Sequence, residues 1–344
     1  LGAASSSSKQ RPPQEIPSGQ EPDLMDIGYW TNRLPSLPGF QGLPSRLLNR
    51  VLPSSMRVPC KVGFPLGPII LILFAGLADS TCLQQAFWLH APELAFHTVE
   101  MDTLRADDSF QDFLDDRNFG ELCWKAASGN LMGLTGGPNC RTWSILRHFP
   151  RPGFPGIVRD RLGPGAWGKA DLSNADKEDV DRDSLLILRM LLLFAISVEA
   201  GVEPAFLLEH PADPCSHSGS TAGASCSSFW ITSQCLAFVA SFMMTMSSFH
   251  QCMLGNPAKK ATSVMTNLSL KHWGKLWCDN NHSHKFHGPS KDLARWGWQM
   301  NVDIALAFKK FYSFVRATKS DKAIPCPLYT SDAADEAHSL DHGA

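Results

Sequence analysis

The sequence predicts an α/β protein with a mostly parallel sheet and helices on both faces. Three observations support this fold class. Short apolar runs alternate along the chain with longer segments of helical periodicity. Several of these runs end in turns of small or acidic residues. The chain has 344 residues, 44% of them hydrophobic, which is enough for one large core. Strands that alternate with helices are typical of a parallel sheet.

The expected strands are short and apolar: Ile69–Phe74, Ala95–Glu100, Leu131–Thr135, Pro204–Glu209 and Ser263–Asn267. The expected helices are longer and amphipathic or apolar: Cys82–His90, Phe119–Ser128 and Asp183–Ala200. The last helix is the clearest, because Asp181 and Asp183 stand near its start and Gly201 follows its end. Residues 229–245 alternate less clearly and receive no assignment.

Both ends of the chain are expected to lie outside the folded domain. Residues 1–60 hold four consecutive serines and many prolines with little periodicity, which is typical of a disordered tail. Residues 327–344 resemble the translation of a sequencing-library adaptor and are excluded from the fold argument. We therefore expect the folded domain over residues 61–326.

Composition restricts the function classes. The formal net charge is -2, so any surface that binds nucleic acid must be local. Ten cysteines are scattered without tight pairing, which favours reduced thiols in an intracellular protein. The two long apolar runs, Pro68–Ala78 and Leu185–Val198, fall below the roughly 20 residues that a spanning helix needs. We expect no membrane segment.

The turn Gly136–Ser144 is the strongest candidate for a reactive site. It places Cys140 in a Gly/Pro-rich turn directly after a predicted strand. In a parallel sheet, ligands bind beyond the carboxyl ends of the strands, where the turns after Phe74, at Glu100 and at Glu209 also fall. A lone cysteine is more often a buried structural residue, but the Gly-Gly-Pro turn argues against burial. A reactive thiolate would require nearby positive charge or backbone donors.

The order of these turns resembles the motif order of the cytosine-5 DNA methyltransferases over about residues 66–315. Four segments carry the resemblance: Phe74-Ala75-Gly76, Val99-Glu100-Met101-Asp102, Pro138-Asn139-Cys140 and Phe206–Pro211. The family has Pro-Pro-Cys and Glu-Asn-Val at the last two. The chain looks closest to the divergent members carried by mobile elements of single-celled eukaryotes.

The resemblance implies a Rossmann-like methyltransferase fold and an enzyme that methylates carbon 5 of cytosine through a covalent cysteine adduct. It gives Cys140 the role of nucleophile. It gives Glu209 the role of general acid, which would hold a flipped cytosine at N3 and the amino group. Lys260 stands where the family's eighth motif, represented here by Gly255–Lys260, carries its first arginine.

The resemblance also implies S-adenosylmethionine as the cofactor. Its binding residues would be Phe74, Ala75, Gly76, Glu100, Asp102, Asp115, Pro138 and Asn301. The Phe74 turn lacks the family's further glycines. Glu100, with Asp102 second, would accept hydrogen bonds from the ribose hydroxyls, because a carboxylate takes two donors. Asn301 belongs to a segment, Leu293–Phe308, that resembles the family's closing motif.

A Gly/Pro-rich stretch from Arg141 to Lys169 supplies the local basic surface that the global charge hides. Its candidates for binding double-stranded DNA are Arg141, Ser144, Arg147, Arg151, Arg159 and Arg161. A loop of this kind could reach phosphates and close over a flipped base. The alternative is an ordinary surface loop. The segment of about residues 261–292 is short for a target-recognition region, so a fused or separate domain could supply targeting. A DNA methyltransferase would work in the nucleus or another intracellular compartment.

Two alternatives remain open. The first is a catalytically inactive, nucleic-acid-binding relic on the same fold, favoured by the altered glycine turn and the missing arginines. The second is a zinc-dependent module built on Cys278, His282, His284 and His287, with Cys252 as a further ligand. Their spacing does not match a standard zinc finger. We therefore assign no metal and expect a polar loop that contacts DNA.

Overall fold

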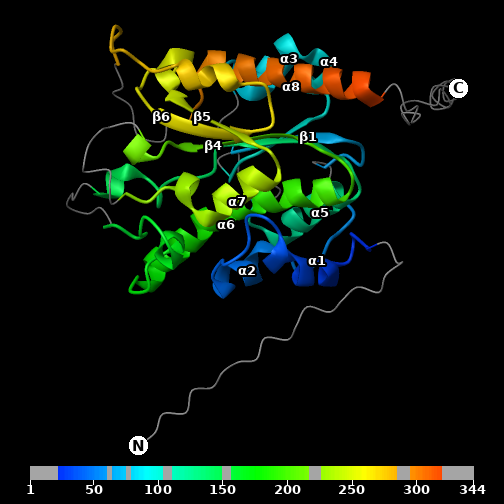
Figure 1. The fold of residues 1–344 in the computed structure, drawn as a ribbon. Helices are drawn as coiled ribbons and strands as arrows, with labels where there is room; N and C mark the ends of the chain where they lie inside the picture. The colour runs from blue at the N-terminus through cyan, green and yellow to red at the C-terminus, as the bar shows by residue number, and fades with distance from the viewer. Residues whose placement is uncertain are drawn as a thin grey trace, which may run out of the picture.

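The computed structural model shows a six-stranded sheet between two layers of helices (Figure 1). It describes residues 22–59, 64–74, 79–103, 111–148, 156–216, 226–284 and 295–319. The strands are β1 (Ile69–Leu73), β2 (Thr98–Met101), β3 (Leu131–Gly136), β4 (Ala205–Pro211), β5 (Thr245–His250) and β6 (Ala261–Thr266). Among the described helices, none combines the length and the apolar character that crossing a bilayer requires.

The sheet has the order β2-β1-β3-β4-β6-β5 and is mostly parallel. β1 pairs in parallel with β2 and β3, and β3 pairs in parallel with β4. β6 runs antiparallel to both β4 and β5. The prediction of an α/β fold with a mostly parallel sheet is confirmed. The chain leaves β1 toward one edge and β3 toward the other, so the β1–β3 boundary is a topological switch point, where such sheets bind ligands.

Helices cover both faces of the sheet (Figure 1). One face carries α3 (Leu83–His90), α4 (Pro92–Ala95) and α8 (Trp298–Lys319). The other face carries α5 (Asp116–Ala127), α6 (Asn174–Glu199) and α7 (Ser233–Ser241), with α1 (Ile27–Arg33) and α2 (Ser45–Val51) outside them. Each layer buries its own hydrophobic cluster against the sheet, as expected for a doubly wound fold.

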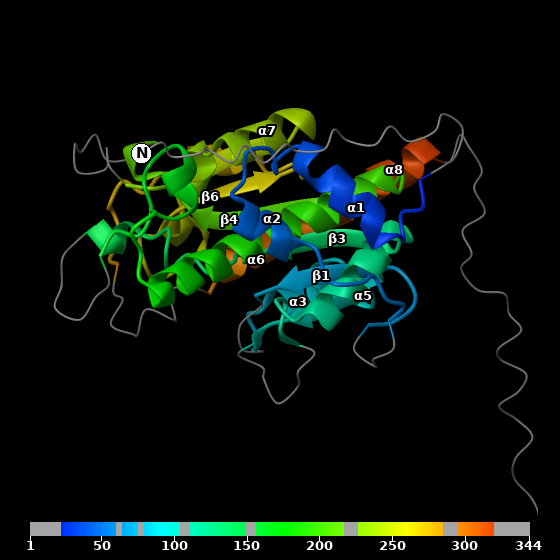
Figure 2. The same cartoon turned by 90° about the horizontal axis from the view of Figure 1, so that it is seen from below.

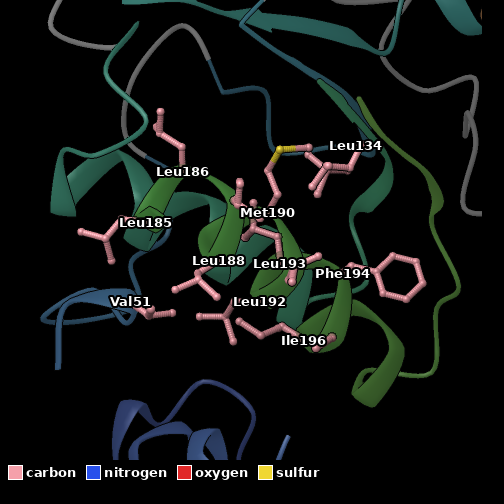
Figure 3. Close-up of a cluster of buried hydrophobic side chains, with 14 of the residues drawn as sticks. Val51, Leu134, Leu185, Leu186, Leu188, Met190, Leu192, Leu193, Phe194 and Ile196 are labelled. Atoms are coloured by element: carbon pink, nitrogen blue, oxygen red, sulfur yellow. The ribbon is translucent and has the colours of Figure 1, made fainter. Parts of the chain in front are cut away.

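The long helix α6 is apolar on nearly all sides because protein surrounds its second half. Figure 3 shows Leu134 of β3 beside Met190 on one side of α6, and Val51 of α2 near Leu188 and Leu192 on another. A helix that is hydrophobic all round is stable only when it is buried all round. The helix begins earlier than predicted, at Asn174, where the Ser173 side chain caps the first turn.

The prediction that residues 1–60 form a disordered tail is wrong for the segment that contains α1 and α2. Helix α2 packs against α6, and the view from below shows α1 and α2 in front of α6 (Figure 2). The apolar side chains that they and their connection bury are Trp30, Leu34, Leu37, Phe40, Leu43, Leu47 and Val51. The spacing of these residues by three and four is a helical pattern that the prolines obscured. Residues 1–21 lie outside the described part of the chain, as do residues 320–344.

The other predicted elements need smaller corrections. Ala95 ends the short helix α4, so β2 begins only at Thr98. The unassigned residues 229–245 contain α7, and the late strand β6 pairs with β5 as an antiparallel ribbon. The closing segment becomes α8, which begins at Trp298.

Candidate functional site

The strand register lines up the predicted functional turns at the carboxyl edge of the sheet. Leu73 of β1 pairs with Met101 of β2 and with Gly136 of β3. Gly136 in turn pairs with Leu208 of β4. The residues that follow these positions therefore lie in a row across the edge: Asp102, Phe74, Gly137 and Glu209. The switch point falls in the middle of this row.

Glu209 is the centre of a polar group that we call the edge cluster: Cys140, Glu209, Gln251, Lys260 and Trp296. Its side chain is buried, and the residue is 4% exposed. Lys260 Nζ lies 3.2 Å from Glu209 Oε1, which also accepts a hydrogen bond of 3.1 Å from Gln251 Nε2. Trp296 Nε1 donates to Glu209 Oε2 at 3.3 Å. Three donors thus fix the orientation of one buried carboxylate.

The Cys140 turn packs directly against Glu209. A Cβ atom on Gly137 would lie 2.5 Å from Glu209 Oε2, so a larger residue would force the turn or the carboxylate to move. Cys140 itself is half-buried. Burial raises the pKa of its thiol to about 11, while the positive charge of Lys260 opposes this shift and the negative charge of Glu209 adds to it. The structure therefore brings together the three residues that sequence analysis named as catalytic.

A second polar group, the buried cluster, holds the far end of the same turn: Thr142, Arg159, Asp183 and Ser184. Asp183 Oδ2 accepts hydrogen bonds from the Thr142 backbone N–H at 2.8 Å and from its hydroxyl at 2.7 Å. Arg159 Nη2 donates to Thr142 Oγ1 at 2.8 Å and to Ser184 Oγ at 3.0 Å. The Arg159 guanidinium also stacks on Trp143, 3.8 Å from the ring centroid.

The predicted DNA-binding arginines are mostly occupied inside the protein. Arg159 is 1% exposed, and burial lowers its pKa to about 9. Arg147 is buried and donates to the Arg141 carbonyl, while Arg161 forms a two-bonded ion pair with Asp213. In this conformation the donors of Arg147, Arg159 and Arg161 bind protein groups, so a phosphate would have to displace those partners; the buried Arg159 has no exposed donor surface to offer.

The remaining DNA-binding candidates differ in position. Arg141 is exposed and forms an ion pair with Asp179 at the start of α6. Ser144 is half-buried close to the turn. Arg151 lies outside the described residues. A phosphate would have to compete with Asp179 for Arg141, which at an exposed site costs little.

The cofactor candidates at the ends of β1 and β2 sit beside the switch point. Phe74 has a positive φ of 58°, an uncommon backbone conformation for a residue other than glycine. Its N–H donates to the Met101 carbonyl at 2.8 Å, which joins the ends of β1 and β2. Glu100 and Asp102 are both buried at this edge. Ala75 and Gly76 lie outside the described residues.

The other three cofactor candidates have separate positions. Asp115 is exposed and caps α5, where its side chain accepts from the Asn118 N–H at 2.9 Å. This structural role accounts for the carboxylate, and no contact given for the described residues links it to the edge cluster. Pro138 is buried behind Gly137. Asn301 on α8 is buried and donates to the Thr81 carbonyl, while its Oδ1 has no hydrogen-bond partner within the described residues.

Sequence analysis missed Gln251, Trp296 and Asp183 as parts of this region. Gln251 lies in the short 3-10 helix η9 (Gln251–Leu254), and its N–H donates to the Lys260 carbonyl across the β5–β6 ribbon. A predicted β5–β6 hairpin would have put Gln251, just after β5, next to Lys260, just before β6. Trp296 and Asp183 had no comparable signal, because both come from segments distant in sequence from the residues that they contact.

No family model and no curated protein sequence matches the chain. Its role therefore has to be argued from the geometry of the edge cluster and its surroundings.

Proposed function

We propose that the chain is a DNA cytosine-5 methyltransferase that uses S-adenosylmethionine. One observation carries the proposal: a thiol, a buried carboxylate and a lysine meet at the carboxyl edge of a mostly parallel sheet, beside its switch point. The three residues come from three different strand ends, and the resemblance assigns catalytic roles to all of them. The more specific methyltransferase fold is part of this proposal.

The edge cluster suits addition to a cytosine ring. The Cys140 thiolate would add to carbon 6 while Glu209, in its acid form, gives a proton to N3, so that carbon 5 becomes nucleophilic. Lys260 would donate to the cytosine O2. After methylation, removal of the carbon 5 proton by a base would expel the thiolate, and N3 would return its proton to the Glu209 carboxylate, which restores the neutral ring.

The residues around the switch point fit the cofactor. Bound S-adenosylmethionine would supply an electrophilic methyl group. The buried carboxylates of Glu100 and Asp102 offer acceptors for its ribose hydroxyls. The Asn301 Oδ1 atom, buried and without a hydrogen-bond partner among the described residues, can accept from a donor of the ligand.

DNA would approach the open side of the turn, where Arg141 and Ser144 lie. Arg147 and Arg159, which bind the Arg141 carbonyl and the Thr142 hydroxyl, would then support the turn instead of contacting phosphates. Arg151 remains a proposed contact. A nuclear site of action follows from this substrate and is proposed with it.

Trapping on DNA tests the proposal. The full chain is incubated with S-adenosylmethionine and duplex DNA that contains 5-fluorocytosine, in which fluorine blocks the final elimination. We expect an adduct that survives denaturation and disappears in Cys140→Ala. The matched control, Cys215→Ala, removes an exposed thiol distant in sequence from the edge cluster and should keep the adduct. A Cys140→Ala protein that still forms the adduct would contradict the assignment.

A second candidate is an inactive DNA-binding protein on the same fold. Two observations favour it: the raised pKa of the Cys140 thiol and the internal binding of three arginines. A folded chain that binds the cofactor and a broad panel of duplexes but never forms an adduct would support this second candidate.

A further inference from the structure

Four side chains outside the edge cluster converge on one point: Cys252, Cys278, His282 and His284. Their sulfur and imidazole nitrogen atoms all lie within 4.8 Å of one another. Cys278 Sγ is 3.3 Å from His284 Nε2 and 3.8 Å from His282 Nε2. Tetrahedral zinc, with Zn–S near 2.3 Å and Zn–N near 2.0 Å, separates such a sulfur and nitrogen by about 3.5 Å. We propose that these four residues bind one structural zinc ion.

The chemical types of the four ligands favour zinc over other metal ions. Two thiolates and two imidazoles are the ligands of structural zinc sites, whereas calcium and magnesium require oxygen ligands. Four protein ligands also close the coordination sphere, which is typical of a structural site and leaves no position for a substrate. His287, the further histidine of the sequence pattern, lies outside the described residues.

Surrounding hydrogen bonds fix the ligands from outside. The Asn280 N–H donates to Cys278 Sγ at 3.3 Å, and such a donor stabilises a metal-bound thiolate. The Cys278 N–H donates to His250 Nδ1 at 2.9 Å, which ties the ligand loop to the end of β5. Lys259 Nζ donates to Asn280 Oδ1 at 2.8 Å. These bonds hold the loop against the end of β5 and the segment before β6.

The ion would cross-link segments that support the edge cluster. Cys252 follows Gln251, the donor to Glu209, within η9. The other three ligands lie in residues 278–284, beyond β6 and inside the segment where target recognition was expected. Zinc would therefore anchor this segment to the turn that positions Gln251. The site is independent of the proposed function, because its ligands take no part in the methyl-transfer chemistry.

Metal analysis of the full chain tests the proposal. We expect about one zinc ion per chain after purification and dialysis, and replacement by cobalt should give the intense visible absorption of a tetrahedral thiolate site. Cys278→Ser and His284→Ala should reduce bound zinc at least tenfold, since each removes one of four ligands. The control Cys215→Ser removes an exposed thiol elsewhere and should keep the full metal content.

Three results would overturn the site. One is a folded wild-type chain that holds less than about a tenth of an equivalent of zinc after loading. Another is an intact mass lower by two hydrogen atoms, with Cys252 and Cys278 joined as a disulfide. The third is a folded Cys278→Ser chain with undiminished zinc. If the variants do not fold, the wild-type metal content and the cobalt spectrum decide the question alone.

Discussion

The edge cluster and the buried cluster contact opposite ends of the Gly136–Ser144 turn, but they differ in solvent exposure and in proposed role. Each combines a carboxylate with a cationic side chain: Glu209 with Lys260, and Asp183 with Arg159. Arg159 is closed off by backbone carbonyls and the Trp143 ring. Lys260 remains partly exposed and stands within electrostatic range of the half-buried Cys140 thiol. Similar residue types therefore have a structural role in the buried cluster and form the candidate catalytic site in the edge cluster.

The two environments, one proposed as reactive and one structural, lie on opposite faces of β4. Successive residues of a strand point to opposite faces, so Glu209 and His210 diverge. Glu209 meets Trp296 and Lys260, whereas His210 is enclosed by the rings of Trp143, Phe229 and Trp230. If the comparison is correct, changes in the buried cluster and around His210 should alter stability, and changes in the edge cluster should alter reactivity.

The largest expected effect is the loss of stability in Arg159→Leu. The substitution leaves Asp183 in the interior without its nearby cation, and removes the donors to the Val180 and Ala166 carbonyls. Leaving a buried carboxylate without a compensating charge, and buried acceptors without their donor, costs about 3–5 kcal/mol of unfolding free energy. Urea denaturation at neutral pH measures it.

The matched control for Arg159→Leu is Arg33→Leu, which breaks the partly exposed ion pair with Glu199. We expect that change to cost less than about 1 kcal/mol. Equal losses in the two variants would remove the distinction between the buried cluster and an ordinary surface pair.

The next effect is a loss of stability in acid caused by His210. Burial lowers the pKa of His210 from 6.5 to about 3, so the folded protein keeps the ring neutral while the unfolded chain protonates near 6.5. The unfolded state therefore binds the proton first, and stability falls as the pH drops below 6.5. Between pH 6.5 and pH 4 this one group removes about 3 kcal/mol.

His210→Phe isolates this effect, because a ring of similar size cannot titrate. Urea unfolding at several pH values should show a flatter acid limb for the variant than for the wild type. An unchanged slope would show that other groups, and not His210, govern the acid response.

The fold was largely predictable from the sequence, because it rests on local apolar patterns. β1, β3 and β4 were expected within a residue or two of their observed bounds. The helices α1 and α2 were missed because prolines and serines around their apolar residues give this segment the composition of a disordered tail. A strand was expected near β6, but its antiparallel direction was not, since strand direction depends on long-range pairing that a run of six residues does not specify.

The site was predictable only where a strand end carries its residue. Cys140 and Glu209 follow that rule and converge. The partners of the arginines were not predictable. The packing of segments far apart in the chain decides whether a guanidinium is exposed to solvent or donates to a carbonyl. Arg159 satisfies Thr142, Val180 and Ser184 at once, and no local pattern around position 159 indicates those partners.

A smaller effect should follow Gly137→Ala, which tests the contact between the turn and Glu209. The new methyl group would lie 2.5 Å from Glu209 Oε2, so the turn or the carboxylate must move. We expect a loss of about 1–3 kcal/mol in unfolding free energy and weaker adduct formation on 5-fluorocytosine DNA. Gly156→Ala is the control, because a Cβ there meets nothing within 4 Å. Full adduct formation in Gly137→Ala would show that this contact does not position Glu209.

The smallest expected effect is a shift in the pKa of the Cys140 thiol. It distinguishes an electrostatic effect of Lys260 and Glu209 on the thiol from a structural one. Lys260 lowers this pKa and Glu209 raises it. Lys260→Met should therefore move the pKa further above about 11, and Glu209→Gln should move it down. At pH 8.5, where alkylation tracks the small thiolate fraction, a shift of about half a unit changes the rate about threefold. Peptide mass spectrometry follows Cys140 and, as an internal reference, the exposed Cys215 in the same sample. Opposite shifts in the two variants would support an electrostatic role, whereas slowing in both would show that the ion pair acts on Cys140 through structure alone.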